Sequence, residues 1–275
     1  MRLPNVKAPA GATDTHMHFY DPKLPAAPNA FMPGEFTIAD YRAVQKRLGL
    51  ERVIVVQPNA YADDNALTVD SIKRIGPNAR GVAVVKADVK DAELERLTAA
   101  GIVAVRIMAL PGGMLHFDVM DAVVARVHPF GWHANIQLDG RRLPDLEAQI
   151  KRLPGRFVID HTGKFLEPVS PESKEFRSLL NLVDTGRCWV KLSAPYETST
   201  TGGPAYEDVS KLARALVKHA PERMLWASNW PHPGNRKPAP PDDADLLDLL
   251  LDWTPDEAVR RKILADNPAE LYGFR

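Results

Sequence analysis

Eight short apolar runs, rich in β-branched residues, recur along the chain and alternate with longer segments of helical spacing. The runs cover residues 12–18, 52–57, 79–85, 102–108, 133–139, 156–161, 188–193 and 223–229. Several are apolar at successive positions, which is typical of strands in a parallel sheet that is covered on both faces. Eight alternating units in a chain of 275 residues predict an α/β fold, specifically a (β/α)8 TIM barrel.

The segments between the runs repeat one helical plan. In residues 37–49, Ile38, Tyr41 and Leu48 lie on one apolar stripe, and Thr37 can cap the start of the helix. We expect further helices over residues 91–101, 118–131, 143–155, 170–186 and 206–221, most of which close with glycine. The composition does not shift along the chain, so we expect one domain over residues 1–275, with residues 21–34 as a long loop over the barrel mouth.

The main alternative fold is an open doubly wound sheet. That fold places a glycine-rich turn after its first strand, where this chain has THMHFYD. A formal net charge of zero gives no basic surface for nucleic acid, and the composition does not favour a membrane protein. The single cysteine, Cys188, excludes an internal disulfide, and Pro4 and Pro9 interrupt the start where a secretory signal needs an apolar run. We therefore expect a cytoplasmic protein with a small-molecule ligand.

Polar side chains gather where the predicted strands end. In a TIM barrel these ends meet at one rim, where the working residues of such enzymes lie. The candidates are His16, His18, Gln57, Asn59, Arg106, Gln137, His161, Lys191, Tyr196 and Asn229.

Four of these positions carry the strongest chemical argument. His16 and His18 are two residues apart on one strand, so both imidazoles should point to the same side, and His161 follows another strand directly. Arg106 lies inside the apolar run IVAVRIMAL, where a guanidinium is costly to bury without an anion, which favours a ligand carboxylate. Asp160 has the opposite strand parity to His161, so we expect it to face the helices and to have a structural role.

Four motifs resemble the amidohydrolase superfamily, in the branch that includes 2-pyrone-4,6-dicarboxylate lactonase. TDTHMHFYD resembles the family's histidine pair on strand one, VIDHTGKF its strand-six histidine, LWASNWPHP its strand-eight signature and DNPAELYGF its closing helix. The resemblance spans nearly the whole chain and implies a barrel enzyme that acts on a lactone. Within this branch the sequence looks most like the isomerases that convert a sugar-diacid 1,5-lactone into the 1,4-lactone during uronic acid catabolism.

The sequence departs from the family pattern at the metal ligands. Asn229 stands where most members have an aspartate, strand four carries Arg106 and no lysine, and strand five ends in Gln137 in place of a histidine. An amide is a poor ligand for a transition metal. We therefore expect no metal and no cofactor, although three histidines could still hold one zinc ion with an open position.

The resemblance and the residues together suggest an internal acyl transfer. One of the three histidines would move the proton, Arg106 would bind the carboxylate, and Asn229 or another histidine would stabilise the oxyanion. The remaining candidates, Gln57, Asn59, Gln137, Lys191 and Tyr196, would bind the sugar hydroxyls. The alternatives are a lactonase that hydrolyses a dicarboxylate lactone, a metal-dependent hydrolase or decarboxylase of the same superfamily, and an inactive binding protein.

Overall fold

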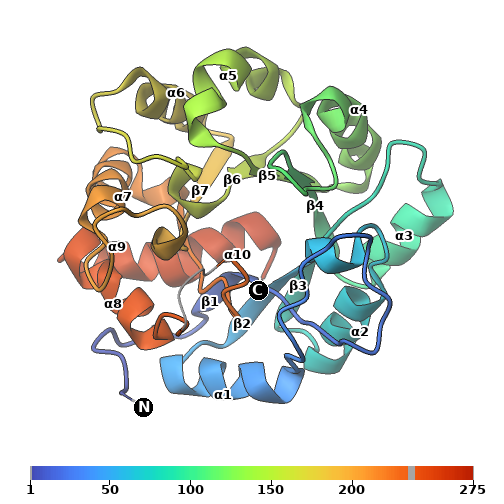
Figure 1. Cartoon of the computed structure of the whole chain (residues 1–275), viewed down its shortest axis with the longest axis horizontal. Helices are drawn as coiled ribbons and strands as arrows, with labels where there is room; N and C mark the ends of the chain where they lie inside the picture. Colours follow the sequence, from blue (N-terminus) through green and yellow to red (C-terminus); the bar gives the residue numbers. More distant parts are fainter. Residues whose placement is uncertain (1, 235–238, 275) are drawn as a thin grey trace.

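Eight parallel strands form one sheet in which each strand pairs with the next along the chain (Figure 1). The computed structural model describes residues 2–234 and 239–274. The strands are β1 (Thr13–Met17), β2 (Arg52–Val56), β3 (Ala79–Ala83), β4 (Ile102–Met108), β5 (His133–Gln137), β6 (Phe157–Ile159), β7 (Cys188–Leu192) and β8 (Met224–Trp226). Backbone hydrogen bonds from Asn229 to His16 and from His18 to Trp230, both 2.9 Å, join the two ends of the sheet. The predicted (β/α)8 barrel is therefore confirmed.

Helices surround the strands on all sides (Figure 1). They are α1 (Ile38–Leu48), α2 (Ala66–Ile75), α3 (Asp91–Ala99), α4 (Phe117–Val127), α5 (Leu143–Arg152), α6 (Lys174–Val183), α7 (Glu207–His219), α8 (Asp243–Trp253), α9 (Glu257–Arg261) and α10 (Asn267–Tyr272). The six predicted helices are all present, and Thr37 caps α1 as expected, through a reciprocal pair of hydrogen bonds with Asp40. In the described part of the chain, none of the helices combines the length and apolarity that crossing a membrane requires.

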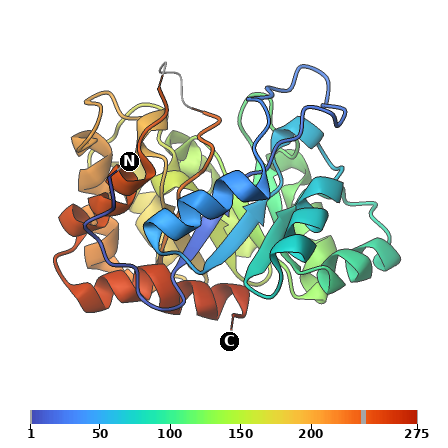
Figure 2. The same ribbon diagram turned by 90° about the horizontal axis from the view of Figure 1, so that it is seen from below.

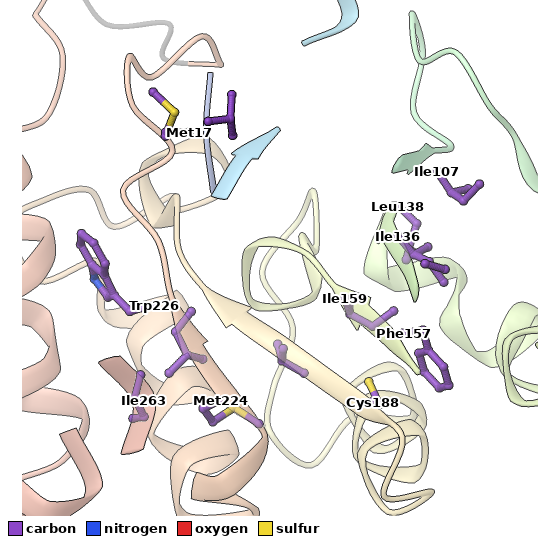
Figure 3. Close-up of a cluster of buried hydrophobic side chains, with 14 of the residues drawn as sticks. Met17, Ile107, Ile136, Leu138, Phe157, Ile159, Cys188, Met224, Trp226 and Ile263 are labelled. Carbon is purple, nitrogen blue, oxygen red and sulfur yellow. The ribbon is translucent and has the colours of Figure 1, made fainter. Parts of the chain in front are cut away.

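The space between the strands and the helices holds most of the apolar core. Met17, Ile107, Ile136, Ile159 and Trp226 all lie in this layer (Figure 3). Side chains alternate across a strand, so the neighbours of these residues point into the barrel. This alternation is what turns several of the polar strand residues toward the barrel axis.

The half of the barrel interior near the amino ends of the strands is apolar and closed. Inward-facing Val158, Trp189 and Leu225 pack against Tyr272 and Phe274 from the end of the chain. The carboxyl terminus lies below the sheet, whereas the long loops rise at the other end (Figure 2). Only the carboxyl ends of the strands are therefore left to build a site.

Strand β1 contains an irregularity that sets the direction of its side chains. Its register against β2 shifts between Asp14 and Met17. Asp14 accepts hydrogen bonds from Tyr41 of α1 (2.8 Å) and from the Ser228 backbone (3.0 Å), while His16 is free to turn into the barrel. Burial raises the pKa of Asp14 to about 6 despite these donors.

The loop after β1 rises beside the barrel mouth (Figure 2). Its base is fixed by an antiparallel bridge between Tyr20 and Phe36. Asn29, Ala30 and Phe31 from this loop line the cavity described next. The expected loop over the mouth is thus found where the sequence placed it.

Candidate active site

A cavity of about 330 Å³ opens at the carboxyl ends of the strands. Of the predicted residues, it is lined by His18, Asn59, Arg106, Gln137, His161 and Asn229. Tyr20, Lys164 and Glu197 also line it, and the sequence analysis did not select them. A groove of about 410 Å³ runs between residues 5–9 and α9, but it lies outside the barrel and away from the strand ends.

Four predicted residues take positions behind or beside the cavity. The Gln57 amide donates to the carbonyls of Ala62 and Asp64, and its oxygen accepts from Thr68, so the side chain fixes the loop after β2. His16 and Lys191 are fully buried beneath the cavity floor. The Tyr196 hydroxyl lies 3.0 Å from Nδ1 of His232.

The protons on His16 and His18 follow from their partners. Nδ1 of His16 lies 3.2 Å from the Lys191 ammonium, which can only donate, so this nitrogen is an acceptor and Nε2 carries the proton. Nε2 of His16 then donates across 3.2 Å to Nε2 of His18. Nδ1 of His18 donates to the Val56 carbonyl at 2.8 Å. Both nitrogens of each ring are therefore already engaged.

His161 keeps one nitrogen available for a ligand. Its Nδ1 lies 2.8 Å from the Ser193 hydroxyl. Its Nε2 has no hydrogen-bond partner within residues 2–234 and 239–274, and the ring lines the cavity. The backbone turns sharply here, because His161, Thr162 and Lys164 all have φ between 43° and 55°. Of the three histidines, His161 is the one placed to exchange a proton with a ligand.

All three histidines are neutral at neutral pH. Burial is the main cause, and it lowers the pKa of His18 to about 3 with help from the Arg106 charge. Burial and Lys191 hold the pKa of His16 well below its usual value, and burial and His16 do the same for His161. A neutral imidazole keeps a lone pair that can accept a proton, although burial makes it a weaker base than a free imidazole.

The expectation that Asp160 faces the helices was wrong. Val158 of β6 points into the barrel, so two residues later Asp160 also points inward. His161 joins it on the same side because its positive φ bends the chain after the strand. Asp160 is fully buried, and its carboxylate lies 3.1 Å from the Lys191 ammonium and 3.5 Å from Nδ1 of His16. Although burial acts to raise the pKa of Asp160, Lys191 and the other nearby positive groups lower it.

A lysine ammonium lies among the potential metal ligands at the cavity floor. Within the described residues, one group of potential ligands is close enough to share an ion, namely His16, Asp160 and His161. The Lys191 ammonium lies within about hydrogen-bond distance of both Asp160 and His16, so a cation already neutralises this group. His18 does not belong to the group, so the three histidines do not converge on one point.

Arg106 is a buried cation that lines the cavity. It is 5% exposed, and it donates to the Gln57 carbonyl (2.7 Å) and to the Gln137 side-chain oxygen (2.9 Å). Its Nε finds no partner among the residues described. Burial lowers the pKa of Arg106, but a guanidinium stays charged in proteins. Gln137 therefore orients the guanidinium, and the two bonds leave three of its five N–H donors unassigned.

The contacts of Asn229 settle how its amide is oriented. The side chain lies 3.1 Å from Oε1 of Glu197, a carboxylate that can only accept, so the atom facing it is Nδ2. The same nitrogen donates to the Tyr196 hydroxyl at 2.8 Å. Because both amide protons are used, the prediction that Asn229 donates to an oxyanion does not fit this geometry. Asn229 offers an acceptor oxygen instead.

Glu197 and Lys164 are the charged cavity residues that sequence reasoning missed. They form an ion pair in which both side chains are largely buried. Lys164 belongs to the motif VIDHTGKF, so its position after the strand-six histidine was a usable signal. Glu197 lies in a turn of 3-10 helix, Pro195–Glu197, where neither strand nor helix periodicity applies.

Residues 13–274 match the family model described as Amidohydrolase. The chain belongs to the amidohydrolase family. This amidohydrolase is 40% identical over 98% of its length to D-galactarolactone isomerase of Agrobacterium fabrum, 93% of which is covered. It is 36% identical to a 2-pyrone-4,6-dicarboxylate hydrolase of Comamonas testosteroni, over 98% of this chain and 92% of that protein. It is 34% identical to a 4-sulfomuconolactone hydrolase of Rhizobium radiobacter, over 96% and 91% of the two chains.

Solved structures agree with this assignment. A ligand-free crystal structure of an Agrobacterium tumefaciens protein is 39% identical, with a TM-score of 0.93 and 99% of both chains covered. The family and the curated relatives are enzymes, so this amidohydrolase is an enzyme, and the resemblance noted from its motifs is confirmed.

Proposed function

We propose that this enzyme is a D-galactarolactone isomerase, which converts D-galactaro-1,5-lactone into the 1,4-lactone within galactarate and uronic acid catabolism. The 40% identity to the Agrobacterium fabrum isomerase supports the substrate. The observation that carries the chemistry is the presence at one cavity of a neutral His161, with Nε2 open to the cavity, and of Arg106, a cation without a carboxylate partner among the described residues.

The reaction needs one proton acceptor and no external water. The C4 hydroxyl attacks the C1 ester carbonyl, and Nε2 of His161 takes the hydroxyl proton. The tetrahedral intermediate then releases the C5 oxygen, which receives that proton from His161. The attacking hydroxyl is part of the substrate, so its effective concentration is high.

The other residues in this proposal bind and orient. Arg106 holds the free C6 carboxylate of the lactone. The Lys164 ammonium supplies positive charge for the developing oxyanion, and Asn229 accepts a hydrogen bond from a substrate hydroxyl. Asn59 and Gln137 line the same wall and contact the remaining hydroxyls. Lys191 has a positioning role, because it holds His16 and Asp160 from below.

A lactone hydrolase is the second candidate, and Glu197 favours it, because a carboxylate at the cavity can activate water. Time-resolved NMR of freshly prepared galactaro-1,5-lactone distinguishes the two. Isomerisation gives the 1,4-lactone as the first product, whereas hydrolysis gives the open diacid. The diacid as the first product would refute the isomerase proposal.

The proposal also includes a reaction that needs no divalent metal. The partner is a small-molecule lactone, neither nucleic acid nor a membrane is involved, and the location is cytoplasmic. The Lys191 ammonium between Asp160 and His16 supports a reaction without a metal. Enzyme treated with a chelator and shown to be metal-free should keep its full isomerisation rate. Loss of activity that returns with added zinc would contradict it.

A further inference from the structure

Glu197 is held in place from three directions. Its Oε2 pairs with the Lys164 ammonium, and its Oε1 accepts from Nδ2 of Asn229 at 3.1 Å. A Cβ on Gly234 would lie 2.1 Å from Oε1, so the loop after β8 approaches the carboxylate closely at a glycine. The side chain is 8% exposed and lines the cavity. These contacts hold the carboxylate at the edge of the cavity.

The cations at the site differ in whether a carboxylate pairs with them. Lys191 is neutralised by Asp160, and Lys164 by Glu197. Arg106 has no carboxylate within salt-bridge distance among residues 2–234 and 239–274. The cavity therefore presents one unpaired positive charge at Arg106 and one balanced ion pair, Lys164–Glu197, whose carboxylate is held in place.

We infer that Glu197 is a specificity-determining residue that restricts the site to lactones with a single carboxylate, and that it accepts a hydrogen bond from a hydroxyl on the same ligand. The inference rests on the proposed function and names the charge class of its substrate. Arg106 binds the one carboxylate. A second carboxylate directed toward Glu197 would meet a like charge that is shielded from water, whereas a hydroxyl there would donate to a free lone pair.

Binding of two unreactive probes tests this inference. Benzoate carries one carboxylate, and benzene-1,3-dicarboxylate carries two on the same ring. We expect NMR titration to show that Glu197→Gln shifts the ratio of the two dissociation constants toward the dicarboxylate by about tenfold or more, because the variant removes the opposing charge. Glu167→Gln is the matched control, since Glu167 is 79% exposed and pairs with Arg141 away from the cavity.

A second variant moves the ratio in the opposite direction. Lys164→Met leaves Glu197 without its cation, so the dicarboxylate should bind less well relative to benzoate. This variant keeps the test decisive if Glu197→Gln does not fold. A ratio that stays within about twofold of wild type in the folded variants would overturn the inference.

The titrations need no turnover, so their outcome is separate from that of the proposed function. Wild-type enzyme that fails to isomerise galactaro-1,5-lactone would refute the proposed reaction. An unchanged binding ratio would refute the role of Glu197 and leave the reaction intact.

Discussion

Replacing Asn229 by aspartate places two carboxylates face to face. Nδ2 of Asn229 lies 3.1 Å from Oε1 of Glu197, and the substitution puts a carboxylate oxygen at that position. At this separation two unit charges repel by about 5 kcal/mol with an effective dielectric constant of about 20, which corresponds to roughly four pKa units. The Lys164 ammonium offsets part of this repulsion. We therefore expect the two carboxylates to share a proton near neutral pH.

The shared proton gives Asn229→Asp a characteristic pH dependence. An aspartate at this position can activate water, so the variant should release more open diacid per rearranged lactone than wild type. The aspartate can activate water only once it and Glu197 have lost their shared proton. Diacid formation should therefore rise with an apparent pKa of about 6 or higher, compared with about 4 for an ordinary carboxyl. The assay is NMR of both products across a pH series.

The double variant Asn229→Asp with Glu197→Gln serves as the control. It removes the opposing charge, so the rise in diacid formation should move back toward about pH 4. Two results would refute the reasoning: a product ratio equal to that of wild type, or a single variant whose rise already lies near pH 4.

Three further predictions concern binding and stability. Arg106→Met should raise KM by about 10- to 100-fold through loss of a charge-assisted contact, and an unchanged KM in steady-state kinetics would assign Arg106 a structural role. Lys191→Met should lower the free energy of unfolding by about 3–5 kcal/mol, because Asp160 stays buried without its partner, and adding Asp160→Asn should recover much of the loss in urea titrations. Burial lowers the pKa of His133 to about 3, so the stability it contributes is complete above about pH 6.5 and is lost as the pH falls toward 3. His133→Asn should therefore make the urea midpoint less sensitive to pH in that interval, and an unchanged slope would contradict this reading.

The barrel fold and the location of the cavity could be predicted from the sequence because both depend on local periodicity. Apolar runs with helices between them predict the barrel, and polar residues at strand ends predict the cavity. His18, Arg106 and His161 could be selected on that basis alone. Their place in the cavity follows from the alternation of side chains along each strand and from the turn after β6.

Other features depend on contacts between distant parts of the chain. Strand β6 has three residues, too few to show from the sequence which of them face the barrel interior. The direction of Asp160 became clear from the position of Val158 inside the barrel. The amide orientation of Asn229 depends on Glu197, 32 positions earlier in the chain. Likewise, the position of Lys191 in its strand suggests a ligand-binding residue, whereas the structure shows a buried ion pair with Asp160. Pairings of this kind leave no pattern in a single sequence.

The most direct test of the account is to run the reaction of galactaro-1,5-lactone in ¹⁸O-labelled water and to analyse the 1,4-lactone by mass spectrometry. Internal acyl transfer predicts a product without label, because no water oxygen enters the C1 carbonyl. Labelled 1,4-lactone formed at the rate of the enzymatic reaction would mean hydrolysis followed by ring closure, and it would contradict the isomerase mechanism.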